Sequence, residues 1–176
     1  MKLSTIDQGL NFIMSIVTMQ VSKMSFFQQP SVLWTLRYIY LASIIFQVIF
    51  YFIIRRRITN VNDQRKLKIK KENNLFDTNR DVEEEIEVTY SEYDLKELNK
   101  SMKSALLQSI IVTVLHIKWK ILQPLIVAGT VPIRAFILNP LYLRYIFNRD
   151  VLRPFDLNTI FEKEEKSTEK RRKKED

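Results

Sequence analysis

The sequence contains no cysteine, a single histidine and only two glycines, and these shortages exclude several kinds of site. Without cysteine, the chain has no disulfide bond, no thiolate nucleophile and no cysteine-ligated zinc. Gly9 and Gly129 lie too far apart to form a glycine-rich phosphate loop or a dinucleotide fingerprint. One histidine cannot build a multi-histidine metal centre, and no G-x-S-x-G elbow is present. We therefore expect no enzyme, no metal site and no cofactor.

Acidic residues are nearly missing from the hydrophobic parts of the chain. The net charge of +8 comes from 28 Lys and Arg against 20 Asp and Glu. Residues 1–54 carry three bases and one acid, Asp7, and residues 102–148 carry five bases and no acid. Residues 55–101, in contrast, hold eleven bases and eleven acids. Because the strongly charged segments are almost neutral overall, we expect no sequence-specific nucleic-acid partner.

The strongest feature is the apolar run 32–54, in which Arg37 is the one charged residue. About 20 apolar residues are enough to cross the hydrocarbon core of a bilayer. The run ends at Arg55, Arg56 and Arg57, and cytoplasmic flanks of membrane spans are enriched in such bases. The sequence therefore predicts a transmembrane helix whose C-terminal end faces the cytosol.

Three weaker apolar segments accompany this run. Residues 6–24 carry a polar stripe on an otherwise apolar helix, and they either span the bilayer with the stripe packed inward or lie along its surface. Residues 103–122 predict a second membrane helix. Residues 125–146 follow as a kinked return span or a re-entrant segment, because prolines interrupt helices. Those prolines are Pro124, Pro132 and Pro140.

Together these patterns predict an all-α membrane protein with about three transmembrane helices plus a broken or re-entrant segment. We expect four regions: a membrane part, a partly helical cytosolic loop, a second membrane block and a mostly disordered cytosolic tail. Their limits are 1–54, 55–102, 103–148 and 149–176. Ser91 and Asp94 are candidate N-caps for a helix around residues 91–101.

Several stretches resemble one family. They are Met19-Gln20-Val21-Ser22-Lys23, Leu36-Arg37-Tyr38-Ile39-Tyr40, Tyr93-Asp94-Leu95-Lys96-Glu97, the spaced set His116, Lys120, Pro124 and Leu125, and Leu152-Arg153-Pro154-Phe155. The family is the fungal endoplasmic-reticulum membrane family first named inorganic phosphate transport protein eighty-eight. It was later assigned as the third component of the SND (SRP-independent) targeting pathway. The resemblance covers about residues 7–156 and is weak over 125–150.

The resemblance implies a multi-pass protein of the endoplasmic-reticulum membrane that assists targeting or insertion of membrane proteins next to the Sec translocon. By analogy of architecture with Oxa/YidC insertases, a small basic groove would receive the client. The implied partners are the translocon, nascent clients and other SND components. The apolar runs add the lipid bilayer, and the basic residues in 55–71 and 170–174 suggest the ribosome as a further partner. Two alternatives stay open: a non-catalytic translocon adaptor or scaffold, and a protein that transports phosphate directly.

Arg37 is the first candidate for the groove, because an ionisable group inside a bilayer is costly and is usually found in a bundle interior or a wet cavity. No acid lies in residues 8–62 or 98–149, so Arg37 is expected to be solvated by water, lipid phosphate, backbone carbonyls or a client. Snorkelling to the interface is the simpler alternative. The other groove candidates are the polar side chains Gln47, Gln8, Asn11, Ser15 and Thr18.

Two further groups of residues are candidates with structural alternatives. His116, Lys118 and Lys120 are interfacial anchors or groove residues, and His116 shares a helix face with Lys120. A cytosolic partner could be contacted by the residues Arg55, Arg56, Arg57, Tyr93, Asp94 and Glu97. For Asp94 and Glu97 the alternative roles are a helix cap and a solvated face.

Overall fold

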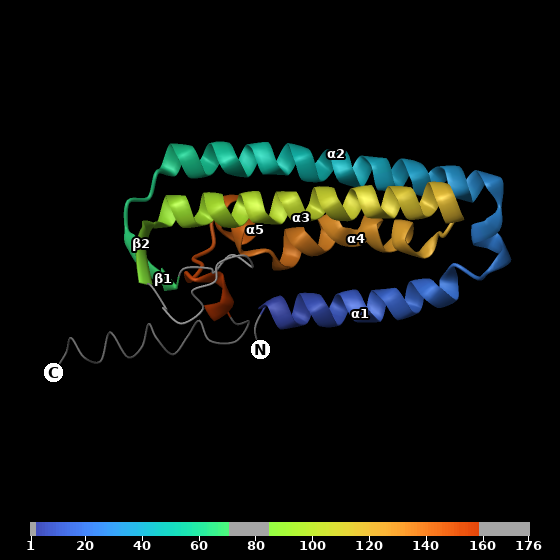
Figure 1. The fold of residues 1–176 in the computed structure, drawn as a ribbon, viewed down its shortest axis with the longest axis horizontal. Coiled ribbons are helices and arrows are strands. Elements are labelled where there is room, and N and C mark those ends of the chain that lie inside the picture. Colours follow the sequence, from blue (N-terminus) through green and yellow to red (C-terminus); the bar gives the residue numbers. More distant parts are fainter. Residues whose placement is uncertain (1–2, 71–84, 159–176) are drawn as a thin grey trace, which may run out of the picture.

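The computed structural model describes residues 3–70 and 85–158 and consists mainly of long helices lying along one axis (Figure 1). The predicted disordered tail from residue 159 and the acidic stretch 71–84 lie outside the described residues. The elements in chain order are α1 (Leu3–Val21), η1 (Ser25–Gln28), α2 (Pro30–Val61), β1 (Lys66–Lys70), β2 (Glu85–Thr89), α3 (Tyr90–Trp119), α4 (Gln123–Leu138), α5 (Pro140–Tyr145) and η2 (Phe155–Leu157).

Helix α4 lies at the centre of the four long helices and contacts the other three. Helices α2 and α3 lie antiparallel, and α4 packs against both of them (Figure 1). Helix α1 packs against α4 and runs along the lower side of the molecule in this view. The β-hairpin caps the end of the bundle at which α2 finishes and α3 begins.

Helix α2 contains the predicted span and extends beyond it. It begins at Pro30, since the ring fixes the helical φ angle and its missing N–H costs nothing in the first turn. It ends at Asn62, which adopts a left-handed conformation (φ 42°) and donates its N–H to the Ile58 carbonyl. Within the described residues, α2 is the one helix long and apolar enough to cross a membrane.

Helix α3 joins two segments that the sequence suggested as separate helices. Its N-cap is Thr89, whose hydroxyl accepts from the Glu92 N–H while the Glu92 carboxylate accepts from the Thr89 N–H. This reciprocal capping box starts the helix before Ser91, so the prediction of Ser91 or Asp94 as the N-cap was wrong. The region limits drawn at residues 54 and 102 mark changes of polarity, and α2 and α3 run through them without a break.

The charged loop contains a two-stranded hairpin, so the all-α prediction was wrong here. Strands β1 and β2 pair antiparallel, with Leu67 opposite Val88 and Ile69 opposite Ile86. Both strands alternate apolar and charged residues, which is the period of a strand with one face exposed. The bases of β1 face the acids of β2, and the Lys66 amine lies 3.5 Å from the Glu87 carboxylate. The mainly helical architecture is otherwise confirmed.

The prolines of the second apolar block act in three different ways. Pro124 stands in the first turn of α4, Pro132 lies inside that helix, and Pro140 begins α5. The predicted break at Pro140 is confirmed, because α4 ends at Leu138 and Asn139 caps α5 by accepting from the Leu141 N–H. The expected interruption of the helix at Pro132 was wrong, because α4 continues through this residue to Leu138. With 16 residues, α4 is roughly 24 Å long, shorter than a bilayer core of about 30 Å.

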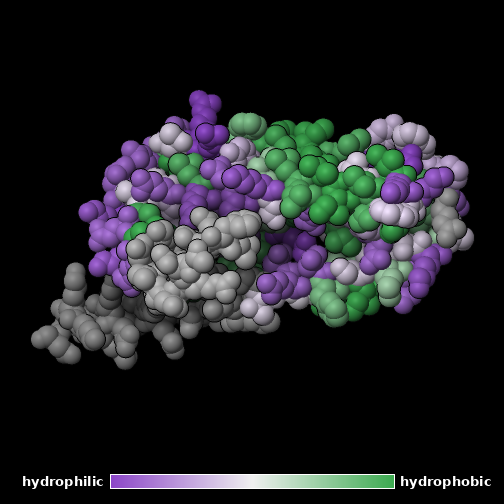
Figure 2. All heavy atoms as spheres, in the orientation of Figure 1, coloured by the Kyte–Doolittle hydropathy of each residue, from purple (hydrophilic) through white to green (hydrophobic). Residues whose placement is uncertain are grey.

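Large apolar side chains cover the outside of the helices as well as the core. Figure 2 shows hydrophobic surface over the middle of the bundle and hydrophilic surface towards its ends. Five side chains on the outer faces are each more than half exposed: Phe12, Ile45, Phe52, Ile110 and Ile117. Soluble monomers seldom expose apolar patches of this extent, so the band is suited to contact with lipid or with other membrane helices.

Candidate functional site

The polar stripe of α1 faces α4 over part of its length. The Thr18 hydroxyl is buried and donates to the Met14 carbonyl at 2.7 Å. The Ser15 carbonyl accepts from the Gln123 amide of α4 at 3.1 Å. Gln8 and Asn11 are exposed. The inward half of the stripe therefore joins α1 to α4, and its outward half borders open space.

A cleft of about 320 Å³ with both polar and apolar walls lies between α1, α3 and α4, and we call it the Arg134 cleft. Figure 2 shows the surface hollowed between α1 and α3, with hydrophilic side chains inside the hollow. The polar residues that line the cleft are Asp7, Glu97, Ser101, Arg134 and Asn139. Apolar side chains of α4 and α5 complete its walls.

Arg134 is the most buried cation of this cleft. Its side chain is 14% exposed, and its Nη1 lies 3.3 Å from Oδ1 of Asp7. Its Nε is buried and has no hydrogen-bond partner among the described residues. A buried donor without a partner is costly, so a water or a polar group that reached this N–H would stabilise Arg134.

The neighbours of α4 show how deep Arg134 lies. Gly129 faces Ile39 of α2, and the ring of Phe136 packs against the rings of Phe46 and Phe50. Arg134 lies between positions 129 and 136. It is therefore level with the middle of the apolar run 32–54, at a depth where an ionised group needs a wet or polar surrounding.

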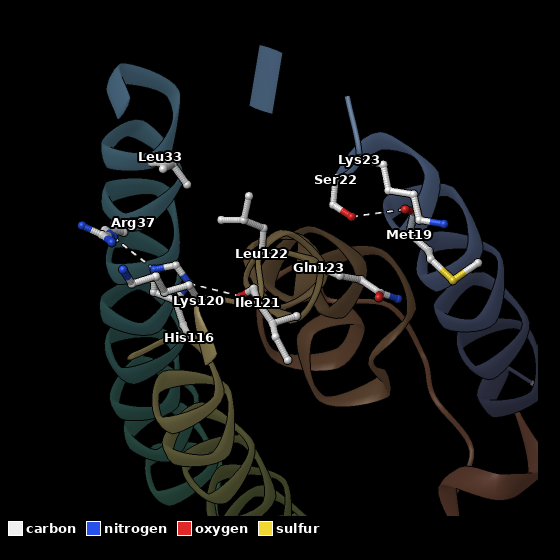
Figure 3. Close-up of a pocket in the computed structure, with 10 residues that line it drawn as sticks. All are labelled: Met19, Ser22, Lys23, Leu33, Arg37, His116, Lys120, Ile121, Leu122 and Gln123. Carbon is white, nitrogen blue, oxygen red and sulfur yellow. Dashed lines mark hydrogen bonds between the residues drawn. The ribbon is translucent and has the colours of Figure 1, made fainter. Parts of the chain in front are cut away.

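A second cavity, of about 430 Å³, lies at the other end of the bundle, and we call it the Arg37 pocket (Figure 3). It brings together Arg37, His116 and Lys120, which the sequence analysis had listed as separate candidates. Nε of Arg37 donates to Nε2 of His116 at 3.1 Å, and Nδ1 of His116 lies 3.1 Å from the Ile121 carbonyl. Arginine has no acceptor, so Nε2 must carry the lone pair and Nδ1 the proton. His116 is therefore neutral in this arrangement, and it is a partner for Arg37 that the sequence analysis did not foresee.

Two other predicted residues lie outside both cavities. Gln47 borders a void of about 10 Å³ between α2, α3 and α4, beside Gln108 and Ser109. Lys118 is exposed, and its amine lies 5.0 Å from the centre of the Trp119 ring. Tryptophan and lysine commonly lie at the membrane–water interface, so the geometry of Lys118 fits an anchor.

The residues predicted for a cytosolic partner divide into exposed and internal ones. Arg55 and Arg56 are exposed at the end of α2. Arg57 is exposed too, but its guanidinium donates to the Tyr145 carbonyl, and the partly buried Glu97 lines the Arg134 cleft. Tyr93 is buried, and its hydroxyl accepts from the Phe155 N–H at 3.0 Å.

Asp94 belongs to a buried ionic cluster. Its carboxylate is fully buried, and it accepts from Nε and Nη2 of Arg153 and from the Tyr145 hydroxyl. Burial opposes the charge of Arg153, but the bonds to Asp94 outweigh it and raise the pKa of Arg153. Burial, helped by the bond to Asp94, raises the pKa of Tyr145. The cluster ties the segment after α5 to α3, so Asp94 is occupied inside the fold.

Sequence reasoning did not identify Arg134 and Asp7 as a pair. Both were visible as isolated charges, the first in an acid-free block and the second as the lone acid of residues 1–54. They are 127 positions apart, and nothing in either local pattern indicates that α1 folds back onto α4.

Fold and cavities together define a helical protein with a span-capable helix, an apolar outer band, a basic pocket at Arg37 and a cleft in which Arg134 lies with the acids Asp7 and Glu97. Comparison of sequences identifies its family. The family model described as Phosphate transport (Pho88) matches residues 7–176, and the chain belongs to that family.

Two relatives match over most of the chain. SRP-independent targeting protein 3 of Saccharomyces cerevisiae is 26% identical over 159 residues, covering 88% of this chain and 83% of the relative. A protein of Schizosaccharomyces pombe named uncharacterized protein C589.06c is 30% identical over 154 residues, covering 84% of this chain and 75% of the relative. No solved structure matches the chain.

Proposed function

We propose that this protein acts in SRP-independent targeting at the endoplasmic-reticulum membrane and assists insertion of client membrane proteins through the Arg134 cleft. The name of the Saccharomyces cerevisiae relative supports the targeting role. The observation that carries the insertion role is Arg134 itself, a cation level with the middle of an apolar run, with an unpaired Nε in that cleft.

The proposed orientation follows from charge and length. Helix α2 spans the bilayer, and its Arg55–Arg57 end faces the cytosol because bases are enriched on that side. The short helix α4 and the polar residues of α1 and α3 then border a wet cleft that opens towards the cytosol. Helices α1, α3 and α4 complete a multi-pass arrangement around it.

The cleft would lower the cost of moving a polar client segment into the bilayer. A polar group entering it meets the side chains of Arg134, Ser101 and Asn139 rather than lipid, while the carboxylates of Asp7 and Glu97 disfavour an acidic one. The apolar outer band then accepts the hydrophobic part of the client. No covalent chemistry is required of the protein.

Site-specific crosslinking tests this proposal. A photo-reactive residue at Ser101, inside the cleft, is expected to crosslink a nascent client in microsomes. The matched probe at Ile110, which is 61% exposed on the same helix, reports contact with the outer face instead. If a client crosslinks at position 110 and never at 101, insertion does not use the cleft.

Arginine variants separate an insertase from an adaptor. Arg134→Gln is expected to lower client insertion about tenfold, the effect of losing one charged hydrogen bond of roughly 1.4 kcal/mol. Arg134→Lys keeps the charge and retains part of the activity, and Arg149→Gln, a change at an exposed base outside the cleft, leaves it unchanged. Asp7→Asn removes the ion pair but keeps the cation, so it should be milder than Arg134→Gln. Full activity in Arg134→Gln would exclude the cleft mechanism.

An adaptor role is the second candidate, and an apolar groove between α2 and α4 favours it. The groove measures about 540 Å³ and contains the small residues Ala42, Ser43 and Gly129, which allow close approach of a neighbouring helix. The Sec translocon and other SND components are the proposed neighbours. An adaptor would tolerate Arg134→Gln and would fail when Ala42→Leu fills the groove.

Ribosome contact is proposed for the exposed bases at the cytosolic end. Arg55, Arg56, Lys66 and Lys68 are all exposed there, on α2 and β1. Binding of this kind weakens steeply with salt. Co-sedimentation with ribosomes should fall on raising the salt concentration and in an Arg55→Glu, Arg56→Glu variant, and indifference to both changes would exclude the contact.

A further inference from the structure

The Arg37 pocket gathers cations from three helix ends and has no acidic lining residue. Lys23 follows α1, Arg37 lies near the start of α2, and Lys120 follows α3. The remaining lining is apolar or uncharged, including Ser22 and Gln123. Like charges gathered without an acid repel one another, and a bound anion would relieve that repulsion.

His116 aims the guanidinium of Arg37 without adding charge. The neutral ring of His116 accepts the hydrogen bond from Nε of Arg37, and the guanidinium carbon lies 4.7 Å from the centre of the Trp34 ring. Among the described residues no hydrogen-bond partner is recorded for the two terminal nitrogens of Arg37. Figure 3 shows these nitrogens and the Lys120 amine on the same side of the pocket, with Lys23 on the other side. The free donors of Arg37 match the oxygens of a phosphate.

The backbone at Lys120 is a second, independent observation. Lys120 closes α3 in a left-handed conformation, with φ 55° and its N–H bonded to the His116 carbonyl. Glycine is the residue usually found at this position, because a side chain there is strained. A lysine stands at this position and lines the pocket together with Arg37.

The position of the pocket fits a lipid headgroup. Arg37 lies five residues inside the apolar run 32–54, which is about 8 Å along the helix. Lys120 and Lys23 lie just beyond the ends of their helices, where the interface begins. Leu33, Ile121 and Leu122 add apolar walls to a cavity whose volume of about 430 Å³ is typical of ligand sites.

We propose that Arg37 and Lys120 bind the phosphate of an anionic phospholipid headgroup on the side of the membrane opposite to Arg55–Arg57. The guanidinium and the amine hold the phosphate oxygens, and the apolar wall receives the start of the acyl chains. This site requires that α2 spans a bilayer, but it does not depend on client insertion through the Arg134 cleft. Lipid binding and insertion can therefore fail separately.

Native mass spectrometry of the full chain in detergent, titrated with phosphatidic acid, tests the site. Arg37→Gln and Lys120→Gly are each expected to weaken binding about tenfold, the effect of one lost charged hydrogen bond. Arg149→Gln and Asn62→Gly are matched controls outside the pocket, an exposed base and a left-handed helix cap, and both should bind like the parent. Lys120→Gly relieves the left-handed strain, so it keeps the test valid if Arg37→Gln fails to fold.

Three results would overturn the proposal. The first is unchanged phosphatidic acid binding in both pocket variants, and the second is an equal loss in the controls. The third is equal binding of phosphatidylcholine, whose ammonium compensates its phosphate. A last arm separates lipid from free phosphate: if inorganic phosphate alone binds more tightly than the lipid, and does so through Arg37, the occupant is phosphate and the lipid assignment is wrong.

Discussion

Breaking the ion pair between Asp94 and Arg153 is expected to destabilise the end of the bundle at which α3 begins more than any surface change. The side chain of Arg153 is 2% exposed and Asp94 is fully buried. Asp94 accepts three hydrogen bonds, two from Arg153 and one from Tyr145. Arg153→Met removes two of the three and leaves a buried carboxylate with one donor.

The expected cost follows from these contacts. A buried charge that loses its partner typically costs about 3–5 kcal/mol. The exposed neighbour Arg149 supplies the control, because Arg149→Met should change the free energy of unfolding by less than about 0.5 kcal/mol. The double variant Asp94→Leu, Arg153→Met removes both charges, so it should be much less destabilised than the sum of the two single variants.

Equilibrium unfolding of the full chain in detergent micelles measures these free energies. Limited proteolysis adds a local readout, since loss of the pair should release residues 150–158 from α3 before the bundle unfolds. A cost below 1 kcal/mol for Arg153→Met would refute the reasoning. So would a double variant whose destabilisation equals the sum of the singles.

Three smaller predictions concern other parts of the fold. Thr89→Ala removes the capping box of α3 and should cost about 1 kcal/mol in thermal unfolding; an unchanged midpoint would show that β2 alone holds the helix end. The hydrogen bond from Arg65 lowers the pKa of Asp63 to about 2. Its stabilising effect, about 1 kcal/mol after allowing for solvent screening, is therefore fully present above pH 4 and lost as the pH falls towards 2. The stability difference between the parent and Asp63→Asn should shrink over that range, and a constant difference would contradict the pair. Gly129→Ala places its Cβ 3.5 Å from Ile39, an ordinary contact, so thermal unfolding should show a gain of about 0.5–1 kcal/mol rather than a loss.

Hydrophobic periodicity and composition were sufficient to predict where the main apolar helices lie. The run 32–54 lies in α2, and the break at Pro140 separates α4 from α5. These features are local, since the length of an apolar run and the chemistry of proline act within a few residues. The hairpin was not predicted because each strand has only five residues. The pairing of the two strands forms only after the chain has turned back, so neither local pattern indicates it.

The candidate site was only partly predictable for the same reason. The sequence analysis selected Arg37, His116 and Lys120 singly, and the fold brings them into one pocket. It did not list Arg134 among the candidates, although Arg134 proved to be a buried cation with an unpaired nitrogen. Residue type and spacing along a helix do not indicate which distant helix will face a charge.

The sequence by itself determined the mainly helical character, the span-capable apolar run, the basic and acid-poor character of the hydrophobic segments and the family. Each of these depends on local pattern or on similarity along the chain. The tertiary structure alone decided the pairing of Arg134 with Asp7, the neutral state of His116 and the burial of Asp94. These depend on contacts between residues 59 to 127 positions apart, and the free energy of a buried charge is set by such contacts rather than by its neighbours in sequence.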